Sequence, residues 1–224
     1  MRIELYVFIV SLLFANCLWA IPITKDMSNA DTAGLFKAFG KNKILPKANE
    51  QQALLALSFY PELINTKIEF RLVDDIVPLT TTPIWWQIVK SGKNRTYLIL
   101  ISFKSNKLLT PILLENLEYN AQIGVLAHEL SHVVEFQEWN FFNFIYHILM
   151  NLSSKYVDTF EYNTDKRTIS HGLGYQLRAW SVDTRKKLDL SKFISEEDIN
   201  NGRERYMNPE TIDKLMLTNP LYAK

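Results

Sequence analysis

Residues 121–136, AQIGVLAHELSHVVEF, decide how this chain is organised. Within them, His128 and His132 are four positions apart, and Glu129 follows the first histidine directly. Residues four apart lie about 40° apart around a helix, so both imidazoles can bind one metal ion. Glu129 then lies beside the metal, where it can act on a water molecule. Apolar residues on the opposite face would pack into the core, as at Ile123, Leu126, Leu130, Val133 and Val134.

A second pair of candidate residues follows in Phe160–Asp165, FEYNTD. Glu161 and Asp165 are also four apart, so they share one face of a second predicted helix. Glu161 lies 29 residues after His132 and can complete a His₂Glu zinc site with a fourth position left for water. Asp165 can hold the far nitrogen of a ligand histidine. The alternative is that all these groups are ordinary solvated side chains.

Another candidate for the third ligand, Glu138, lies six residues after His132. A straight helix carries that position about 240° round from His132, so Glu138 cannot join the site without a turn of the chain. A turning glycine is expected at position 135, but that residue is Glu135, and the next glycine is Gly172. We therefore reject Glu138 and retain Glu161.

Composition and charge exclude several other functions. The chain has 224 residues, and its 25 Lys and Arg against 24 Asp and Glu leave a net charge of +1, which does not favour nucleic acid as a partner. With seven glycines, it has no glycine-rich phosphate loop. Its one cysteine, Cys17, excludes an internal disulfide and any multi-cysteine zinc site. A metal must therefore be held by histidines and carboxylates.

The first 20 residues, MRIELYVFIVSLLFANCLWA, are typical of an export signal. Arg2 precedes an apolar run from Leu5 to Trp19, and Ala20 ends a tolerable cleavage pattern. The alternative is an uncleaved anchor, because the run is nearly long enough to span a bilayer. We expect an exported protein that is periplasmic, secreted or anchored by this segment, with residues 21–224 forming one domain.

The rest of the chain predicts an α+β fold. It has a small, mostly antiparallel sheet packed on the active-site helix, and a largely helical C-terminal half. A helix is expected at 47–60, and Asn120 is expected to cap the active-site helix. A further helix should start at Asn208-Pro209. Strands are expected at 67–73, 84–89 and 97–103, the last two forming a hairpin around a loop at 90–95.

The two motifs together, VLAHELSHVVEF and FEYNTDKRTISHGLG, resemble the gluzincin clan of zinc metallopeptidases. They are most similar to the group of membrane heat-shock zinc peptidases and prenyl-protein endopeptidases, over about residues 67–175. The resemblance implies a zincin-like fold, one Zn²⁺ bound by His128, His132 and Glu161, and Glu129 as general base. This chain differs in having no spanning segment after residue 20 and in its Tyr162–Asp165 stretch.

Two further histidines are candidates for other roles. His171 precedes Gly172 at a predicted helix end, where it could stabilise the oxyanion of the reaction, with Tyr175 as the second candidate. The alternative is a histidine that favours a helix C-terminus. His147 belongs to a narrow polar stripe in the uncharged segment 139–152, which is either a buried amphipathic helix or a helix that contacts a membrane surface.

These observations favour a zinc-dependent endopeptidase that acts on a peptide or protein. Glu129 would take the proton of a metal-activated water. The hairpin 84–103 could bind an extended substrate by strand addition, and Trp85 and Trp86 could shape a subsite. The alternatives are an inactive zincin-like binding module at the cell surface, or a zinc amidase acting on a non-protein amide.

Overall fold

The computed structural model describes residues 22–189 and 204–223. The predicted export signal at 1–20 lies outside these residues. Within the two described ranges, every helix is too short or too polar to cross a lipid bilayer.

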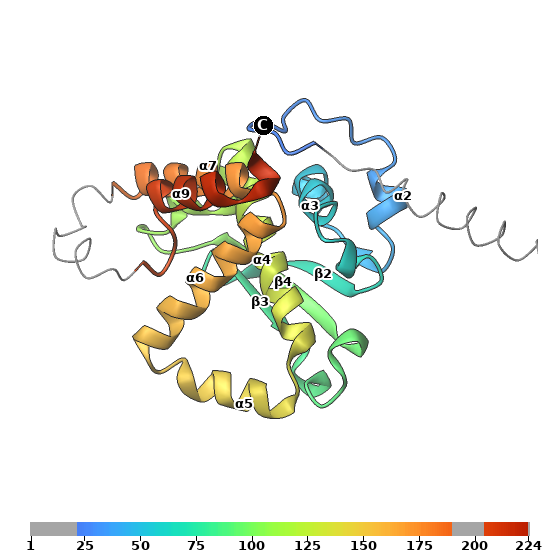
Figure 1. The fold of residues 1–224 in the computed structure, drawn as a ribbon. Coiled ribbons are helices and arrows are strands. Elements are labelled where there is room, and N and C mark those ends of the chain that lie inside the picture. The colour runs from blue at the N-terminus through green and yellow to red at the C-terminus, as the bar shows by residue number, and fades with distance from the viewer. Residues whose placement is uncertain (1–21, 190–203, 224) are drawn as a thin grey trace, which may run out of the picture.

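One layer of the fold is a four-stranded sheet with the order β1-β2-β4-β3 (Figure 1). The β1–β2 and β2–β4 pairs are parallel, and only β3 and β4 are antiparallel. The α+β class is thus confirmed, whereas the prediction of a mostly antiparallel sheet is wrong. The strands are β1 (Lys43–Ile44), β2 (Lys67–Asp74), β3 (Leu79–Pro83) and β4 (Thr96–Lys104).

The parallel pairing follows from the path of the chain. The chain runs along β2, returns along β3 and runs forward again along β4, so β2 and β4 point the same way. Because β4 lies between β2 and β3, it pairs with both of them. Strands β1 and β2 are joined through helix α3 (Glu50–Leu57), since neighbouring parallel strands need a crossover connection.

The predicted strand at 84–89 is also wrong. Strand β3 lies earlier, and a 3₁₀ turn at Trp85–Gln87 begins a loop that continues to β4. Pro83 suits the end of an edge strand, because it has no N–H to donate to a further ladder. The guanidinium of buried Arg95 fixes this loop against the helices by donating to the carbonyls of Ile88, Phe136 and Trp139.

The central element is helix α4 (Tyr119–Glu138), which is buried continuously from Ala121 to Val133. It contacts β3 and α3 on one side and two later helices, α6 (Ser154–Ser170) and α7 (Gly174–Lys187), on the other. A helix with neighbours on all sides can be apolar around its whole circumference. The two candidate histidines are therefore held in a buried stretch of α4.

The start of α4 differs from the prediction. Glu118, not Asn120, occupies the N-cap position. The side chain of Asn120 instead accepts the N–H of Met27 and donates to Asp26, so it ties the N-terminal segment to the helix.

The remaining elements surround this centre (Figure 1). Helix α9 (Pro209–Thr218) begins at Pro209 as predicted and packs on α7, whereas α5 (Phe141–Met150) lies at the far end of the molecule. A short helix, α2 (Leu35–Phe39), precedes β1. Further 3₁₀ turns lie at Lys47–Asn49, Pro61–Leu63, Gly92–Asn94, Thr110–Ile112, Leu114–Asn116 and Pro220–Tyr222.

Candidate metal centre

Three side chains from two helices meet at one point. The Nε2 atoms of His128 and His132, both on α4, are 3.1 Å apart. The Oε2 atom of Glu161 on α6 lies 3.0 Å from the first of them and 3.4 Å from the second. Ligand atoms at about 2.0–2.1 Å from one tetrahedral zinc would be separated by about 3.3 Å. This buried His₂Glu group can therefore hold a metal ion, and its spacing fits zinc.

The far side of each imidazole is held by a residue of α6. Asp165 Oδ1 lies 2.8 Å from His128 Nδ1, and Thr164 Oγ1 lies 3.3 Å from His132 Nδ1. Because the Thr164 hydroxyl donates to the carbonyl of Phe160, its free lone pairs accept the N–H of His132. Both rings thus carry a proton at Nδ1, which leaves Nε2 free to bind a metal.

A buried chain of hydroxyl groups supports this arrangement from behind. Tyr60 donates to the carbonyl of Ala127, and its oxygen lies 2.9 Å from Ser131 Oγ. Ser131 Oγ lies 2.9 Å from Thr168 Oγ1, and Thr168 donates to the carbonyl of Thr164. The network connects α4 to α6 through polar groups that are fully paired, as groups buried this deeply must be.

The buried groups of the triad shift one another's pKa values. Burial by itself lowers the pKa of His128, but its hydrogen bonds to Asp165 and Glu161 outweigh burial and raise that pKa well above the usual value. Burial likewise raises the pKa of Glu161, but its bonds to His128 and His132 hold it far below the usual range. The hydrogen bonds of the site therefore favour a protonated His128 beside an ionised Glu161.

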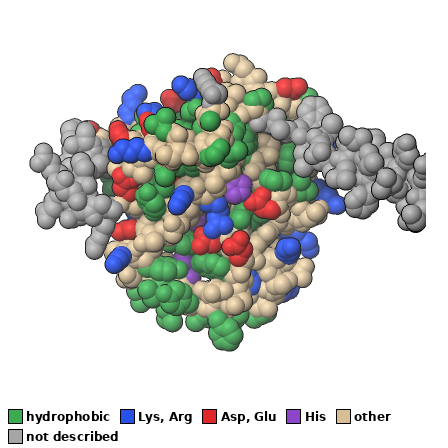
Figure 2. Space-filling model, in the orientation of Figure 1, with side chains coloured by type: hydrophobic (Ala, Val, Ile, Leu, Met, Phe, Trp, Pro, Cys, Tyr) green, Lys and Arg blue, Asp and Glu red, His purple; other side chains and the backbone are tan. Residues whose placement is uncertain are grey.

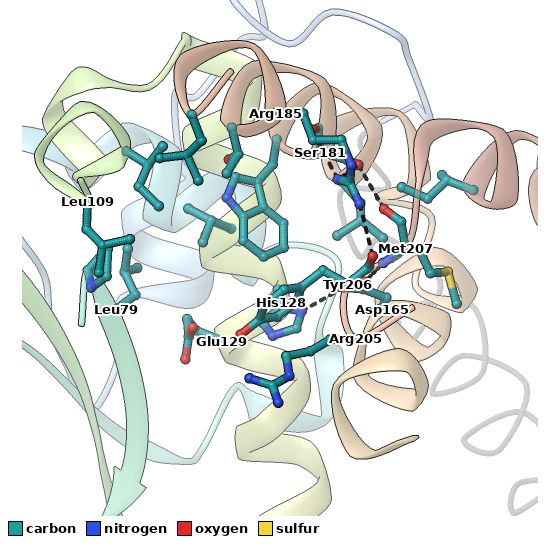
Figure 3. Close-up of a pocket in the computed structure, with 18 of the residues that line it drawn as sticks. Leu79, Leu109, His128, Glu129, Asp165, Ser181, Arg185, Arg205, Tyr206 and Met207 are labelled. Carbon is teal, nitrogen blue, oxygen red and sulfur yellow. Dashed lines mark hydrogen bonds and ion pairs between the residues drawn. The ribbon is translucent and has the colours of Figure 1, made fainter. Parts of the chain in front are cut away.

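Glu129 lies next to this triad, and β3 fixes its orientation. The hydroxyl of Thr81 donates to Glu129 Oε2 at 2.7 Å. Glu129 does not belong to the ligand group, yet it lines the same cleft (Figure 3). Its free carboxylate oxygen can therefore act on a molecule bound at the metal.

Two cavities meet at the triad. The first, of about 440 Å³, is enclosed mainly by apolar side chains and is drawn in Figure 3. The second, of about 380 Å³, lies on the His132 side between β3 and α5. Both are lined by His128, Glu129 and Tyr206, so the two cavities adjoin at the candidate metal site, and together we call them the cleft. Apolar lining of the first cavity comes from Leu79, Leu109, Ile112, Leu177, Trp180, Met207 and Ile212, among others.

A segment just before α9 closes this cleft on one side. The backbone N–H of Met207 donates to Asp165 Oδ2 at 2.8 Å, so Asp165 connects a ligand histidine to this segment. Ser181 and Arg185 of α7 donate to the carbonyls of Met207 and Tyr206, respectively. The segment is therefore anchored to both α6 and α7.

These contacts place the aromatic ring of Tyr206 in the cleft, 5.7 Å from the ring of His128. The residue keeps 41% of its surface exposed, whereas burial of its phenol and the charges of Glu161 and Glu129 raise the pKa of Tyr206 well above its usual value. Its hydroxyl is thus protonated at neutral pH and can donate. The surrounding sequence, RERYMN, contains no motif that would have predicted a hydrogen-bond donor in the cleft.

The structure does not bring His171 or Tyr175 to the triad. His171 stacks on Tyr60, and its ring nitrogens lie 2.9 Å from the carbonyl of Arg167 and 2.7 Å from Glu62 Oε1. Tyr175 packs against Tyr222. In the part of the chain that the structure describes, neither residue lines either cavity beside the triad.

The segment 139–152 is largely exposed. Of the residues in α5, only Phe144 is buried, so the interpretation as a buried amphipathic helix is wrong for most of its apolar side chains. His147 faces an aromatic cluster that includes Trp139 and Phe160, and burial lowers its pKa to about 4. His147 of α5 and Trp85 of the loop after β3 both line the second cavity.

Fold and site together define an α+β protein with a candidate zincin-like metal centre. Comparison with family models, with curated proteins and with solved structures gave no match for this chain. The assignment of the centre therefore rests on the geometry of His128, His132 and Glu161 alone.

Proposed function

We propose that this protein is a zinc-dependent endopeptidase of the gluzincin type. The observation that carries the proposal is the meeting of two imidazole nitrogens and one carboxylate oxygen at 3.0–3.4 Å, with Glu129 beside them. A site that only held zinc for stability would have no use for a fourth, oriented acidic group in an open cleft. Zinc, when bound, supplies Lewis acidity that polarises a carbonyl group and acidifies water.

The chain's own residues account for the proton movements. Glu129 accepts a proton as water attacks the carbonyl carbon, and it gives that proton to the amine nitrogen as the C–N bond breaks. Thr81 keeps the carboxylate turned toward the cleft. The hydroxyl of Tyr206 donates to the carbonyl oxygen as negative charge develops on it. We therefore transfer to Tyr206 the oxyanion role expected for His171.

Strand β3 supplies a place for an extended substrate. It is an edge strand of the sheet, and Thr80 and Thr82 occupy the hydrogen-bonded positions opposite β4. The backbone groups of Leu79 and Thr81 therefore point away from the sheet, where a peptide can pair with them. Side chains of such a peptide would enter the two cavities, and the larger of these favours an apolar residue.

Substitution of Glu129 by Gln tests the proposal. Gln has nearly the same shape and still accepts a hydrogen bond from Thr81, but it cannot take up a proton. We expect the variant to retain one zinc per chain and its fold, and to lose hydrolysis of a broad peptide library. Glu138→Gln, the same change at an exposed position of α4, is the matched control and should remain active. Equal activity of Glu129→Gln and the parent chain would contradict the proposal.

A further inference from the structure

Two segments far apart in the sequence form an exposed apolar surface at one end of the molecule. The loop after β3 contributes Trp85, Trp86 and Val89, and α5 with the turn that follows contributes Phe142, Tyr146, Leu149 and Leu152. Figure 1 places α5 at this end, and Figure 2 shows hydrophobic side chains gathered there. We call these seven residues the aromatic tip. Large side chains such as Trp86, 74% exposed, and Phe142, 76% exposed, rarely cluster on a surface without a partner.

The aromatic tip is a built surface, because its two segments are held together. Arg95 donates to the carbonyl of Ile88 in the loop and to those of Phe136 and Trp139 before α5. Its guanidinium also lies 4.8 Å from the ring of Phe144. At Gly92 the loop passes so close to α4 that an added Cβ would lie 1.8 Å from the carbonyl oxygen of Gln137.

The charged side chains within the two segments of the tip have one sign. Lys90, Lys93 and Lys155 are exposed beside it, and the ranges 84–95 and 139–155 contain no acidic residue. The nearest acidic residues along α4 and α6 are Glu138 and Asp158, and Asp158 is paired with Arg205. The polar residues between the apolar side chains are uncharged, as at Asn140, Asn143 and Asn151.

We propose that the aromatic tip docks on a phospholipid bilayer that carries anionic headgroups. Trp and Tyr favour the boundary between headgroups and acyl chains, and lysines beside them are attracted to an anionic surface. Interfaces with proteins are depleted of lysine and enriched in arginine, whereas the three cations here are lysines. Charge complementarity thus selects an anionic membrane rather than a second protein surface.

Docking would place the cleft at the membrane. Trp85 of the tip and Ile148 of α5 also line the second cavity, which opens between the two segments. A polypeptide that lies on or emerges from the bilayer would therefore reach β3 directly. This consequence rests on the proposed function, but docking itself does not, because it requires neither zinc nor hydrolysis.

A dye placed on the tip tests docking in the full chain. In a Cys17→Ser background, Phe142→Cys would be labelled with an environment-sensitive fluorophore and mixed with phosphatidylcholine vesicles that contain phosphatidylglycerol. We expect a blue shift and quenching by nitroxide-labelled lipid. The matched control is Leu217→Cys on α9, also highly exposed, whose dye should remain in water. This readout reports the tip itself, so insertion of residues 1–20 into the same vesicles does not replace it.

The charge requirement is tested with the same labelled protein. Vesicles of phosphatidylcholine alone should give a much weaker signal, and Lys90→Gln with Lys93→Gln should lower the apparent affinity by about fivefold for each lysine. A dye at position 142 that stays in water overturns the proposal, and so does an equal signal from neutral vesicles. A dimer in solution that Phe142→Ser converts to a monomer would assign the tip to self-association and also overturn it. Loss of hydrolysis in Glu129→Gln without loss of docking would show that the two proposals are separate.

Discussion

At the scale of single residues, the candidate metal site depends on groups outside the His128, His132 and Glu161 triad. Asp165 has both carboxylate oxygens engaged, one by a ligand histidine and the other by the backbone of Met207. Thr164 and Thr81 orient His132 and Glu129 in the same way. Three polar residues thus fix the orientation of the two histidines and of Glu129.

Asp165→Asn should weaken zinc binding without unfolding the chain. An amide can accept from His128 Nδ1, but its NH₂ group then faces the N–H of Met207, and the negative charge behind the imidazole is lost. Such changes typically lower metal affinity or activity by about 10–100-fold. Competition with a coloured chelator measures this affinity. Asp213→Asn is the control, because it removes a half-exposed carboxylate of α9 that is paired with Arg178, and it should leave zinc affinity unchanged. Unchanged affinity in Asp165→Asn would show that Asp165 does not support the site.

Tyr206→Phe should slow turnover by about 100-fold and leave zinc content and KM nearly unchanged, because the hydroxyl acts only when charge develops on the carbonyl oxygen. Steady-state kinetics on a cleaved library peptide separate kcat from KM. The same substitution at Tyr175, which packs against Tyr222 away from the cleft, is the control. If Tyr175→Phe slowed the reaction and Tyr206→Phe did not, the role would belong to Tyr175, which was the second candidate after His171 in the sequence.

At the scale of elements, the site depends on how closely α4 approaches α7. Gly124 lies where an added Cβ would be 2.1 Å from the carbonyl oxygen of Gln176, a backbone atom that no side-chain rotation can move. About two turns further along α4, the hydroxyl network of Ser131 and Thr168 sets the distance to α6. The helix is therefore held against two neighbouring helices at fixed distances.

Gly124→Ala should destabilise the protein, although alanine favours helix by about 1 kcal/mol over glycine. The clash forces α4 and α7 apart, and overpacking of this kind costs about 1–3 kcal/mol or more. Urea unfolding of the two proteins measures the difference in free energy. The sign of this difference decides the test. A higher free energy of unfolding in Gly124→Ala would mean that α4 and α7 are not in close contact at this point.

At the scale of the whole molecule, the candidate metal site connects parts of the chain that are distant in sequence. His128 and His132 come from α4 and Glu161 from α6, while Asp165 binds the segment before α9. A metal bound at this point would link the sheet-packed helix to the C-terminal helices. Its removal should therefore affect global stability as well as activity.

Chelation should lower the thermal unfolding midpoint, and added zinc should restore it. Free zinc at 100 times its Kd contributes about 2.7 kcal/mol, which corresponds to roughly 5–10 °C for a chain of this size. Differential scanning calorimetry with and without chelator measures the shift. His132→Ala should show no zinc-dependent shift, and the metal-site assignment would fail if its response matched that of the parent chain.

The sequence alone determined the local features whose cause lies in nearby residues. The spacing of His128 and His132, and of Glu161 and Asp165, places each pair on one helix face by backbone geometry. The start of α9 at Pro209 and the strands β2 and β4 are likewise consequences of local composition, and all are present in the structure. The candidate metal-ligand group could be predicted because helical periodicity leaves only a few residues that can face the same point as the two histidines.

Only the tertiary structure decided which distant elements meet. Strands β2 and β4 pair in parallel because β4 lies between β2 and β3 in the sheet. The local sequence pattern of a strand does not show which strands will be its neighbours. Tyr206 reaches the cleft only because Asp165 and α7 bind the backbone around it. His171 is adjacent in sequence to the ligand helix, yet it turns toward Glu62 and Tyr60. Hydrogen bonds between segments far apart in the chain fix these positions, so the spacing of residues along the sequence cannot reveal them.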